Sequence, residues 1–302
     1  MARRRSARVV QRRVTTHPGR ARSSSALSWF VVVLVVVAVL VRWVGQHPDG
    51  IAGAWNGLTQ LVGQGVPAQP PIPPGERVAP PPGEGEADAP LGVPPAAADP
   101  GAPHTFTESQ TLQDGRTVPV TWSPCRAIHY VVDLTGAPPD FRDRAAAVIA
   151  EVSAATGFAF VNDGTVMEPA SASREPYQPE LYGDRWAPAL IRFTDATVIP
   201  EFATQHVGLG GPVGVRATPD GPLHFVSGFA YLDTDLLTSP DVAGEPAYVA
   251  VLRHELGHML GLGHVDDPSQ LMYGEGNAVT TFQAGDLAGL AELGRGSCAP
   301  DI

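Results

Sequence analysis

His254-Glu255-Leu256-Gly257-His258-Met259-Leu260-Gly261-Leu262-Gly263-His264 spaces three imidazoles and one carboxylate as a catalytic zinc ion requires. Because an α-helix has 3.6 residues per turn, the four-residue step puts His254 and His258 on one helical face. Gly261 has no Cβ, so it can adopt a left-handed conformation, end the helix and turn the chain back. His264 can therefore reach the same ion from outside the helix.

Glu255 lies next to His254 in the sequence but points away from the ligand face. Three neutral nitrogen ligands leave the fourth position of Zn²⁺ to water, whose pKa falls from near 16 to about 7 on binding. Glu255 could take the proton of this water as general base and pass it to a leaving amine. The alternative for the short HExxH pattern is an exposed salt-bridging helix face. Gly261, the third histidine and the downstream Leu271-Met272-Tyr273 disfavour that alternative.

The motif resembles that of the metzincin clan of zinc peptidases, and most closely its matrixin (matrix-metalloprotease-like) branch. The resemblance implies that His254, His258 and His264 bind the zinc, that Glu255 is the catalytic base and that Gly261 makes the turn. The implied fold class is α+β, a zincin/metzincin-like catalytic domain. Such a domain has a twisted mixed β-sheet, an active-site helix, a Met-turn and a C-terminal helix.

Outside the motif the resemblance is only partial. Met272, eight residues after His264, matches the methionine that supports the metal site in the Met-turn of the clan. Val265 stands where some matrixins and most reprolysin-like enzymes have Ser or Asp. Tyr273 is adjacent to Met272, whereas the tyrosine ligand of astacin-like and serralysin-like members lies two places after the methionine. The inhibitory PRCGxPD-type cysteine switch of matrixins is absent from the sequence. No latency mechanism is therefore predicted.

The N-terminal sequence is typical of a membrane signal. Residues 1–26 contain eight arginines and no acidic residue, and an apolar, valine-rich run follows at 27–44. This run is long enough to cross a bilayer, and the arginines predict an N-terminus inside and a catalytic domain outside the cell membrane. The alternative is a secreted protein whose signal peptide is cleaved near Ala52-Gly53-Ala54.

Residues 45–104 have the composition of an extracytoplasmic linker. Thirteen prolines lie between Pro67 and Pro103, and large apolar residues are scarce. Such a segment buries too little surface to fold alone, so it is expected to be extended and partly polyproline II. A proline-motif ligand for a partner domain is the alternative.

Residues 105–302 form the predicted zinc metallopeptidase domain of 198 residues, with 25 acidic residues, 10 arginines and a net charge of −15. This charge argues against nucleic-acid binding. We expect a monomeric catalytic domain that acts on proteins or peptides. The matrixin resemblance leaves Ca²⁺ open as a second cofactor, but no EF-hand-like loop appears and its ligands are unknown.

Hydrophobic periodicity predicts the elements of this domain. Strands are expected at residues 127–133, 158–161, 189–193 and 224–233. A helix is expected to open at Pro138-Pro139-Asp140, with an apolar stripe of Phe141, Ala145, Val148, Ile149 and Val152, and to end before Gly157. Residues 167–182 are expected to form an irregular loop, and residues 208–214 are likewise rich in glycine.

Two further helix boundaries are predicted around the motif. Pro246 suits the first turn of the motif helix. After the predicted Met-turn, Thr280 and Gln283 offer a capping box for a final helix. Its apolar stripe would be Leu287, Leu290 and Leu293.

The matrixin resemblance also implies where an extended substrate would lie. In that family the strand before the zinc helix borders the cleft and pairs with the substrate backbone. We expect it to comprise Phe225, Val226, Ser227, Gly228, Phe229, Ala230, Tyr231 and Leu232. A buried strand without a ligand is the alternative.

The two cysteines, Cys125 and Cys298, flank the predicted elements of the domain. In an oxidising compartment such a pair predicts one disulfide. A zinc-blocking thiolate at Cys125 is the alternative. Of the other histidines, His206 could contribute to a second metal, but no acid at a matching spacing supports this.

Two classes of function remain open. The first is a zinc-dependent endopeptidase that hydrolyses extracytoplasmic proteins through a metal-activated water, with Glu255 as base. The second is a catalytically silent, zinc-containing adhesion or interaction module of the cell envelope. A silent module has no need of an ionised base beside the metal, so Glu255 distinguishes the two.

Overall fold

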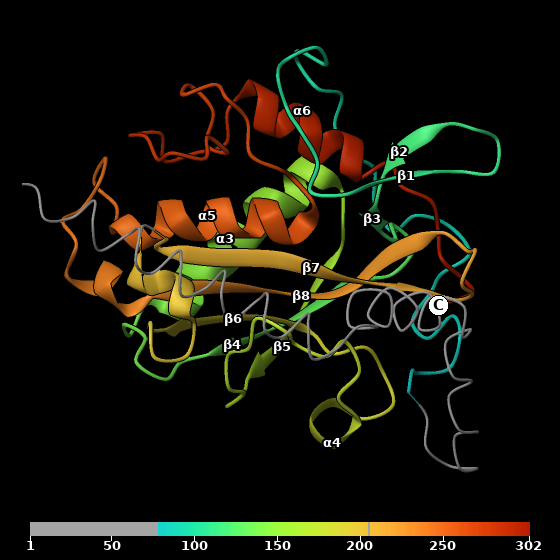
Figure 1. Cartoon of the computed structure of the whole chain (residues 1–302), viewed down its shortest axis with the longest axis horizontal. Coiled ribbons are helices and arrows are strands. Elements are labelled where there is room, and N and C mark those ends of the chain that lie inside the picture. Colours follow the sequence, from blue (N-terminus) through green and yellow to red (C-terminus); the bar gives the residue numbers. More distant parts are fainter. Residues whose placement is uncertain (1–77, 205) are drawn as a thin grey trace, which may run out of the picture. The chain divides into compact units, whose positions relative to one another are not determined.

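The computed structural model describes residues 78–204 and 206–302 (Figure 1). The predicted basic N-terminus, the membrane span at 27–44 and the first part of the predicted linker lie outside these residues. Within them, no helix is long and apolar enough to cross a membrane.

The described chain begins with four strands, continues with strands and helices interspersed, and ends with two helices. The strands are β1 (Ser109–Thr111), β2 (Thr117–Pro119), β3 (Thr121–Trp122), β4 (Ile128–Asp133), β5 (Phe160–Thr165), β6 (Ala189–Thr194), β7 (Gly208–Arg216) and β8 (Leu223–Asp233). The α-helices are α3 (Phe141–Thr156), α4 (Pro179–Tyr182), α5 (Ala247–Leu260) and α6 (Ala284–Leu293), and the 3₁₀ helices are η1 (Pro200–Ala203) and η2 (Thr234–Thr238).

A six-stranded mixed sheet organises the domain. The order β3-β8-β6-β4-β5 is joined by parallel pairs, whereas β7 pairs antiparallel with β8. Both β3 and β6 pair with β8, so β7 occupies the other side of that strand. This mixed architecture, with a parallel-dominated sheet and few helices, is compatible with the predicted fold class.

The three longer helices, α3, α5 and α6, cover one face of the sheet, and the short α4 lies on the other side (Figure 1). The predicted apolar stripe of α3 is buried between its helix and the sheet: Phe141, Ala145, Val148, Ile149 and Val152. Gly157 ends α3 with φ of 74°, as predicted. A second, smaller hydrophobic cluster, including Leu190 and Tyr231, covers the opposite face. The central strands are therefore buried on both faces.

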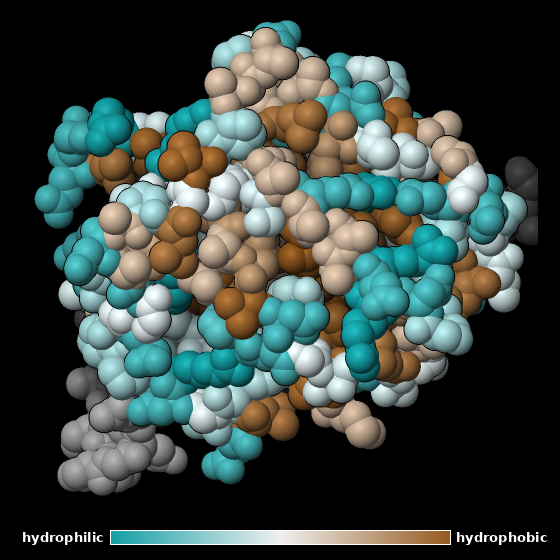
Figure 2. Space-filling model, turned by 180° about the vertical axis from the view of Figure 1, so that it is seen from behind, coloured by the Kyte–Doolittle hydropathy of each residue, from teal (hydrophilic) through white to brown (hydrophobic). Residues whose placement is uncertain are grey.

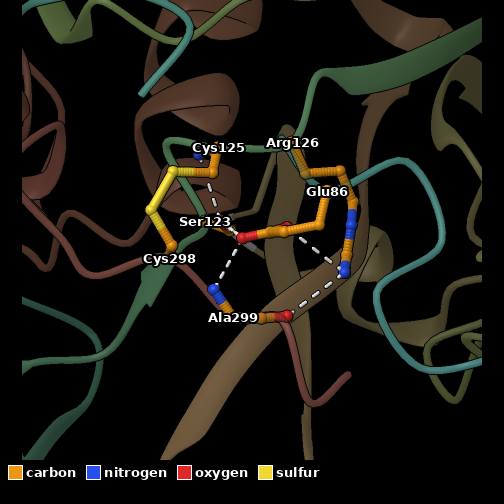
Figure 3. Close-up of a disulfide and its surroundings, with 6 residues drawn as sticks. All are labelled: Glu86, Ser123, Cys125, Arg126, Cys298 and Ala299. Carbon is orange, nitrogen blue, oxygen red and sulfur yellow. Dashed lines mark hydrogen bonds and ion pairs between the residues drawn. A yellow bond between two sulfur atoms is a disulfide. The ribbon is translucent and has the colours of Figure 1, made fainter. Parts of the chain in front are cut away.

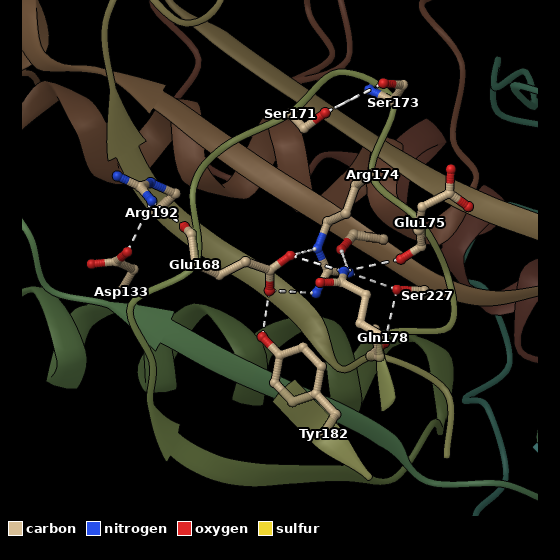
Figure 4. Close-up of polar contacts among 12 residues, drawn as sticks. Asp133, Glu168, Ser171, Ser173, Arg174, Glu175, Gln178, Tyr182, Arg192 and Ser227 are labelled. Atoms are coloured by element: carbon tan, nitrogen blue, oxygen red, sulfur yellow. Dashed lines mark hydrogen bonds and ion pairs between the residues drawn. The ribbon is translucent and has the colours of Figure 1, made fainter. Parts of the chain in front are cut away.

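The predicted irregular loop at residues 167–182 contains only α4 and is fixed by a buried ion pair (Figure 4). The two carboxylate oxygens of Glu168 accept hydrogen bonds from Nε and Nη2 of Arg174 at 2.7 and 2.8 Å. Tyr182 and Gln178 also donate to this carboxylate. Arg174 Nη1 donates to Ser227 Oγ of β8 at 2.7 Å. The loop is thus attached to the central sheet.

The C-terminal helix α6 corrects one prediction. Its capping box is formed by Gln283 at the N-cap and Asp286 three residues later, not by Thr280 and Gln283. Leu290 and Leu293 are buried as expected, but Leu287 is 42% exposed. The buried face of α6 is centred on Asp286, Gly289 and Leu293, and at 100° per residue Leu287 lies outside that face.

The last part of the predicted linker packs against the domain. We call residues 78–107 the strap. Glu86 accepts a hydrogen bond from Ser123 Oγ at 2.5 Å, and the backbone N–H groups of Ala87 and Leu91 donate to the carbonyls of Cys125 and Pro124. The folded unit therefore begins before residue 105.

The strap lies close to the disulfide that joins Cys125 and Cys298 (Figure 3). Their Cα atoms are 5.3 Å apart, and 173 positions separate them in the sequence. The predicted pairing is thus present, and it leaves Cys125 without the free thiol that the zinc-blocking alternative needs.

The surface seen from behind mixes polar and apolar residues, and the apolar ones form small groups (Figure 2). A domain whose large apolar side chains are mostly buried is expected to have such a surface.

Candidate metal centre

The structure brings the three imidazoles of the motif together. His254 and His258 lie one turn apart on α5, and His264 follows the helix end. The Nε2 atom of His264 lies 3.1 Å from Nε2 of His254 and 3.0 Å from Nε2 of His258. Three nitrogen ligand atoms thus converge on one point, as a tetrahedral metal with one open position requires.

Hydrogen bonds at the Nδ1 atoms of His254 and His258 fix the orientation of these two rings. Nδ1 of His254 lies 2.8 Å from the carbonyl oxygen of Leu271, and Nδ1 of His258 lies 2.8 Å from that of Leu262. A carbonyl can only accept, so each Nδ1 carries the proton and donates it. The Nε2 lone pairs are then available to a metal ion.

The surroundings also keep the imidazoles neutral. Burial lowers the pKa of His258 to about 3, with smaller contributions from the neighbouring His254 and His264. Burial likewise lowers the pKa of His254 and of His264. Neutral rings suit metal ligation, since a protonated imidazole has no free lone pair.

The helix that carries the first two imidazoles ends at Gly261, where φ is 118°. Its N–H donates to the carbonyls of Gly257 and His258, which closes the last turn. A Cβ at Gly261 would lie 3.1 Å from Leu293 Cδ2 and 3.2 Å from Phe225 Cε2. Both the backbone conformation and the close packing therefore favour glycine at this turn.

The end of the strap holds the loop that carries His264. Gly263 N donates to the carbonyl of Thr105 at 2.8 Å, and Thr107 N donates to that of Gly261 at 2.9 Å. The hydroxyl of Thr105 donates to the carbonyl of His264 at 2.7 Å. This contact could not be predicted from the sequence, because no local pattern relates residues 159 positions apart.

Glu255 lies on another side of α5 and is only 6% exposed. Burial raises the pKa of its carboxyl to about 8, although a hydrogen bond from the backbone of Gly210 in β7 opposes this shift. A cation bound near the carboxyl would favour its ionised form and lower that pKa. The charge state of the Glu255 carboxyl would therefore depend on a nearby metal.

Two glycines allow β7 to approach Glu255. A Cβ on Gly208 would overlap the Glu255 carboxylate, and a Cβ on Gly210 would overlap the backbone carbonyl of Glu255. The glycine-rich stretch at residues 208–214 is thus a strand packed closely against a helix. No strand was predicted there, because glycine has a low preference for strands and usually indicates loops.

Met272 lies against the motif helix and is 1% exposed. A Cβ on Gly257 would lie 2.7 Å from Met272 Sδ, so the lack of a side chain at Gly257 leaves room for the thioether. The carboxylate of Asp286 accepts from the N–H groups of Met272 at 3.2 Å and Leu271 at 2.8 Å. Asp286 is therefore a support residue that was not predicted, although an acid near the start of a helix is a typical capping signal.

The donor set fits zinc, because three neutral imidazoles of fixed orientation are typical ligands of that metal. The family model described as Matrixin matches residues 205–293 of the chain. This segment is matrixin-like. A comparison with curated proteins found no match.

The matrixin-like segment extends from just before β7 to the end of α6. It contains the three imidazoles, Glu255, Gly261 and Met272, whereas β1 to β6 and α3 precede it. The match supports a zinc metallopeptidase at the level of the family.

The side chains of Tyr273 and His206 have hydrogen-bond partners other than the three imidazoles, although His206 is close enough to His264 to help lower its pKa. The hydroxyl of Tyr273 donates to Glu275 at 3.0 Å. His206 is exposed, and its Nδ1 lies 3.2 Å from the hydroxyl of Thr204. Besides the three imidazoles, the described residues hold one other potential ligand cluster, Glu86 with Cys125 and Cys298, whose sulfurs form the disulfide.

The predicted substrate strand at residues 225–232 is not at an edge of the sheet. Its strand, β8, pairs with β7 on one side and with β3 and β6 on the other, and all eight residues are buried. Its backbone is thus unavailable to a peptide, and the prediction is wrong. Among the described strands, β7 pairs only with β8. The edge next to α5 therefore belongs to β7.

Proposed function

We propose that the chain is a zinc-dependent endopeptidase whose metal is held by His254, His258 and His264. The observation that carries this proposal is the convergence of three Nε2 atoms, together with the buried carboxylate of Glu255, the residue next to His254 on α5. A zinc ion held there would act as a Lewis acid and lower the pKa of a coordinated water to about 7.

Each residue around the proposed metal site would then have its own role in hydrolysis. Glu255 takes the proton of the attacking water and returns it to the nitrogen of the leaving amine. The N–H of Gly210 in β7 orients the carboxylate. Leu271 and Leu262 hold the imidazoles of α5 through their carbonyls. In this assignment Met272 is the counterpart of the Met-turn methionine.

The unpaired side of β7 offers a binding surface for the substrate backbone. A peptide in extended conformation can add to such an edge through main-chain hydrogen bonds, with little regard to its sequence. Pro212 lies within β7, and proline in strands is typical of sheet edges. We therefore move the proposed substrate strand from β8 to β7.

The location and the assembly of the enzyme are further proposals. The apolar run at residues 27–44 would anchor the chain in the cell membrane, with a monomeric catalytic domain outside and extracytoplasmic proteins or peptides as substrates. Alkaline extraction of membranes tests the anchor, since a spanning protein stays with the lipid and a secreted one does not. The charge of residues 105–302 still argues against a nucleic-acid partner.

Hydrolysis of fluorescence-quenched casein by the full chain tests the peptidase proposal. We expect zinc-dependent cleavage that falls by roughly 10²–10⁴-fold in Glu255→Gln, because the variant cannot accept the proton. Atomic absorption should find one zinc ion per chain in both proteins, since Glu255 is not a ligand. Wild-type protein that holds zinc but cleaves nothing would contradict the proposal and favour the silent envelope module.

A further inference from the structure

A buried carboxylate lies behind one of the three imidazoles of the metal centre. Asp286, in the first turn of α6, is 2% exposed. Its Oδ1 accepts from the N–H of Met272 at 3.2 Å, and its Oδ2 accepts from the N–H groups of Leu271 and Gln283, each at 2.8 Å. Only the bond from Gln283 belongs to the cap of the helix. Capping alone therefore does not account for the contacts of Asp286.

The peptide group between Leu271 and Met272 connects this carboxylate to His254. Its N–H donates to Asp286 Oδ1, and its C=O accepts from Nδ1 of His254 at 2.8 Å. The peptide is trans, so its C=O and N–H point in opposite directions. Asp286 and His254 thus lie on opposite sides of one planar group. We call this series of imidazole, peptide group and carboxylate the relay.

Hydrogen bonds in such a series strengthen one another. Because the peptide group is conjugated, a carboxylate that accepts from its N–H increases the negative charge on its carbonyl oxygen. That oxygen then attracts the Nδ1 proton of the imidazole more strongly, and this raises the electron density at Nε2. Histidine ligands commonly donate to a carboxylate directly, with the same effect on the ring. In the relay a peptide group stands between the two.

The second imidazole on α5 has a comparable series of bonds with a neutral end. Nδ1 of His258 also lies 2.8 Å from a carbonyl oxygen, that of Leu262. The N–H of the same peptide group belongs to Gly263 and donates to the carbonyl of Thr105 at 2.8 Å. The two series differ in their last acceptor, which is a carboxylate behind His254 and an uncharged carbonyl behind His258. The protein thus contains an internal comparison for the effect of the charge.

We propose that Asp286 is a positioning residue for the metal centre, which acts on His254 through the peptide group between Leu271 and Met272. It fixes the direction of the Nδ1–H bond and strengthens the bond from Nε2 to a metal. The proposal rests on the proposed function only in that His254 must be a metal ligand, and it requires no cleavage of peptide bonds. The alternative is that Asp286 only caps α6 and holds the chain at Met272.

The imidazole N–H signals of the full chain, labelled with ¹⁵N in its histidines and stripped of metal, test the relay by NMR. A stronger hydrogen bond moves the proton signal downfield, so we expect the Nδ1–H signal of His254 to lie downfield of that of His258. In Asp286→Asn the signal of His254 should move upfield, and that of His258 should stay. No shift, or equal shifts of both signals, would overturn the proposal.

Zinc affinity, measured by competition with a fluorescent chelator, tests the consequence for the metal. We expect Asp286→Asn to bind zinc about tenfold more weakly than the wild type, as is usual for groups outside the coordination sphere. The matched control is Glu292→Gln on the same helix, which removes the same charge from an exposed pair with His104 and should keep the wild-type affinity. Unchanged affinity of a folded Asp286→Asn variant would contradict the proposal.

The two measurements separate failure of the relay from failure of the proposed function. A wild type that binds no zinc would contradict the proposed function, and the metal-free NMR comparison would still decide whether Asp286 acts on His254. Should Asp286→Asn not fold, the order of the two signals in the wild type decides, because it needs no variant. A His254 signal that does not lie downfield of the His258 signal would then overturn the proposal.

Discussion

At the scale of single residues, the metal centre depends on positions that have no side chain. Gly208 and Gly210 let β7 lie against Glu255, and Gly257 leaves space for Met272. These positions are not at turns, and they are glycine because two elements approach closely. Their effect on the centre is therefore steric.

Gly208→Ala tests this steric requirement. The new methyl group would overlap the Glu255 carboxylate, so we expect roughly 1–3 kcal/mol lower stability and a marked loss of peptidase activity. Gly211→Ala in the same strand is the control, because its nearest neighbour, Phe229 Cζ, would be 3.8 Å away. Urea unfolding and casein hydrolysis measure the two effects. Equal behaviour of both variants would show that the close approach is unimportant.

At the scale of elements, the strap acts on the metal centre through the loop that carries His264. Thr105 donates to the carbonyl of His264, and the neighbouring backbone bonds align the two segments. Groups that orient a metal ligand from outside its coordination sphere commonly contribute 10–100-fold to affinity. The strap should therefore contribute to metal binding without touching the metal.

We expect Thr105→Val to bind zinc about tenfold more weakly than the wild type, because the carbonyl of His264 loses its donor. Competition with a fluorescent zinc chelator measures this difference without relying on catalysis. Thr105→Ser keeps the hydroxyl and should retain wild-type affinity. A valine variant with unchanged affinity would limit the strap to a packing role.

Elements with a local signature were predicted well from the sequence. The helix α3 and the strands β4, β6 and β8 follow from hydrophobic spacing and helix-ending glycines. The three imidazoles and Glu255 were found because a single helix and its turn hold them. The strand β7 was missed because its glycines reflect contact with a distant helix, and the substrate strand was misassigned as a result. Thr105 was missed because it contacts His264, which lies 159 positions away in the sequence. Asp286 was missed because it accepts from the backbone N–H groups of Leu271 and Met272, and such bonds leave no pattern in the sequence.

At the scale of the whole molecule, stability depends on side-chain contacts that connect segments far apart in the sequence. The buried pair of Glu168 and Arg174 fixes the outer loop to β8. Burial alone would raise the pKa of Glu168, but hydrogen bonds and the charge of Arg174 hold that pKa below its usual value. The ionised carboxylate is therefore favoured in the folded state.

Arg174→Met should lower the free energy of unfolding by about 3–5 kcal/mol, because Glu168 would stay buried without its partner. The matched control is Arg116→Met, which should change the stability little, because its pair with Asp114 is exposed and screened by solvent. Urea unfolding at pH 7 measures both. Similar losses in the two variants would contradict the role of burial.

The same pair predicts a dependence on pH. Because the pKa of Glu168 is lowered on folding, its stabilising contribution is present above about pH 4 and is lost as the pH falls further. Unfolding of the wild type should therefore become easier between roughly pH 5 and pH 3, and Glu168→Gln should flatten this change. A variant with an unaltered pH profile would assign the acid sensitivity to other carboxylates.

The disulfide gives a second link at this scale. Reduction of the bond between Cys125 and Cys298 should cost about 2–5 kcal/mol, because it releases a long loop in the unfolded chain. Thermal unfolding with and without reductant measures the shift. The control is the double variant Cys125→Ser with Cys298→Ser. Its unfolding temperature should resemble that of the reduced protein and should not change when reductant is added.

The glycines of β7 have a consequence for how selectivity could evolve. Four of the nine residues of this strand are glycine, so the strand can offer a peptide its backbone but few side chains. Discrimination between substrates would then fall to the loop between His264 and α6. Under the proposed function, changes in that loop would alter which proteins are cut while the proposed backbone pairing with β7 stays intact, so that new specificities arise without rebuilding the catalytic centre.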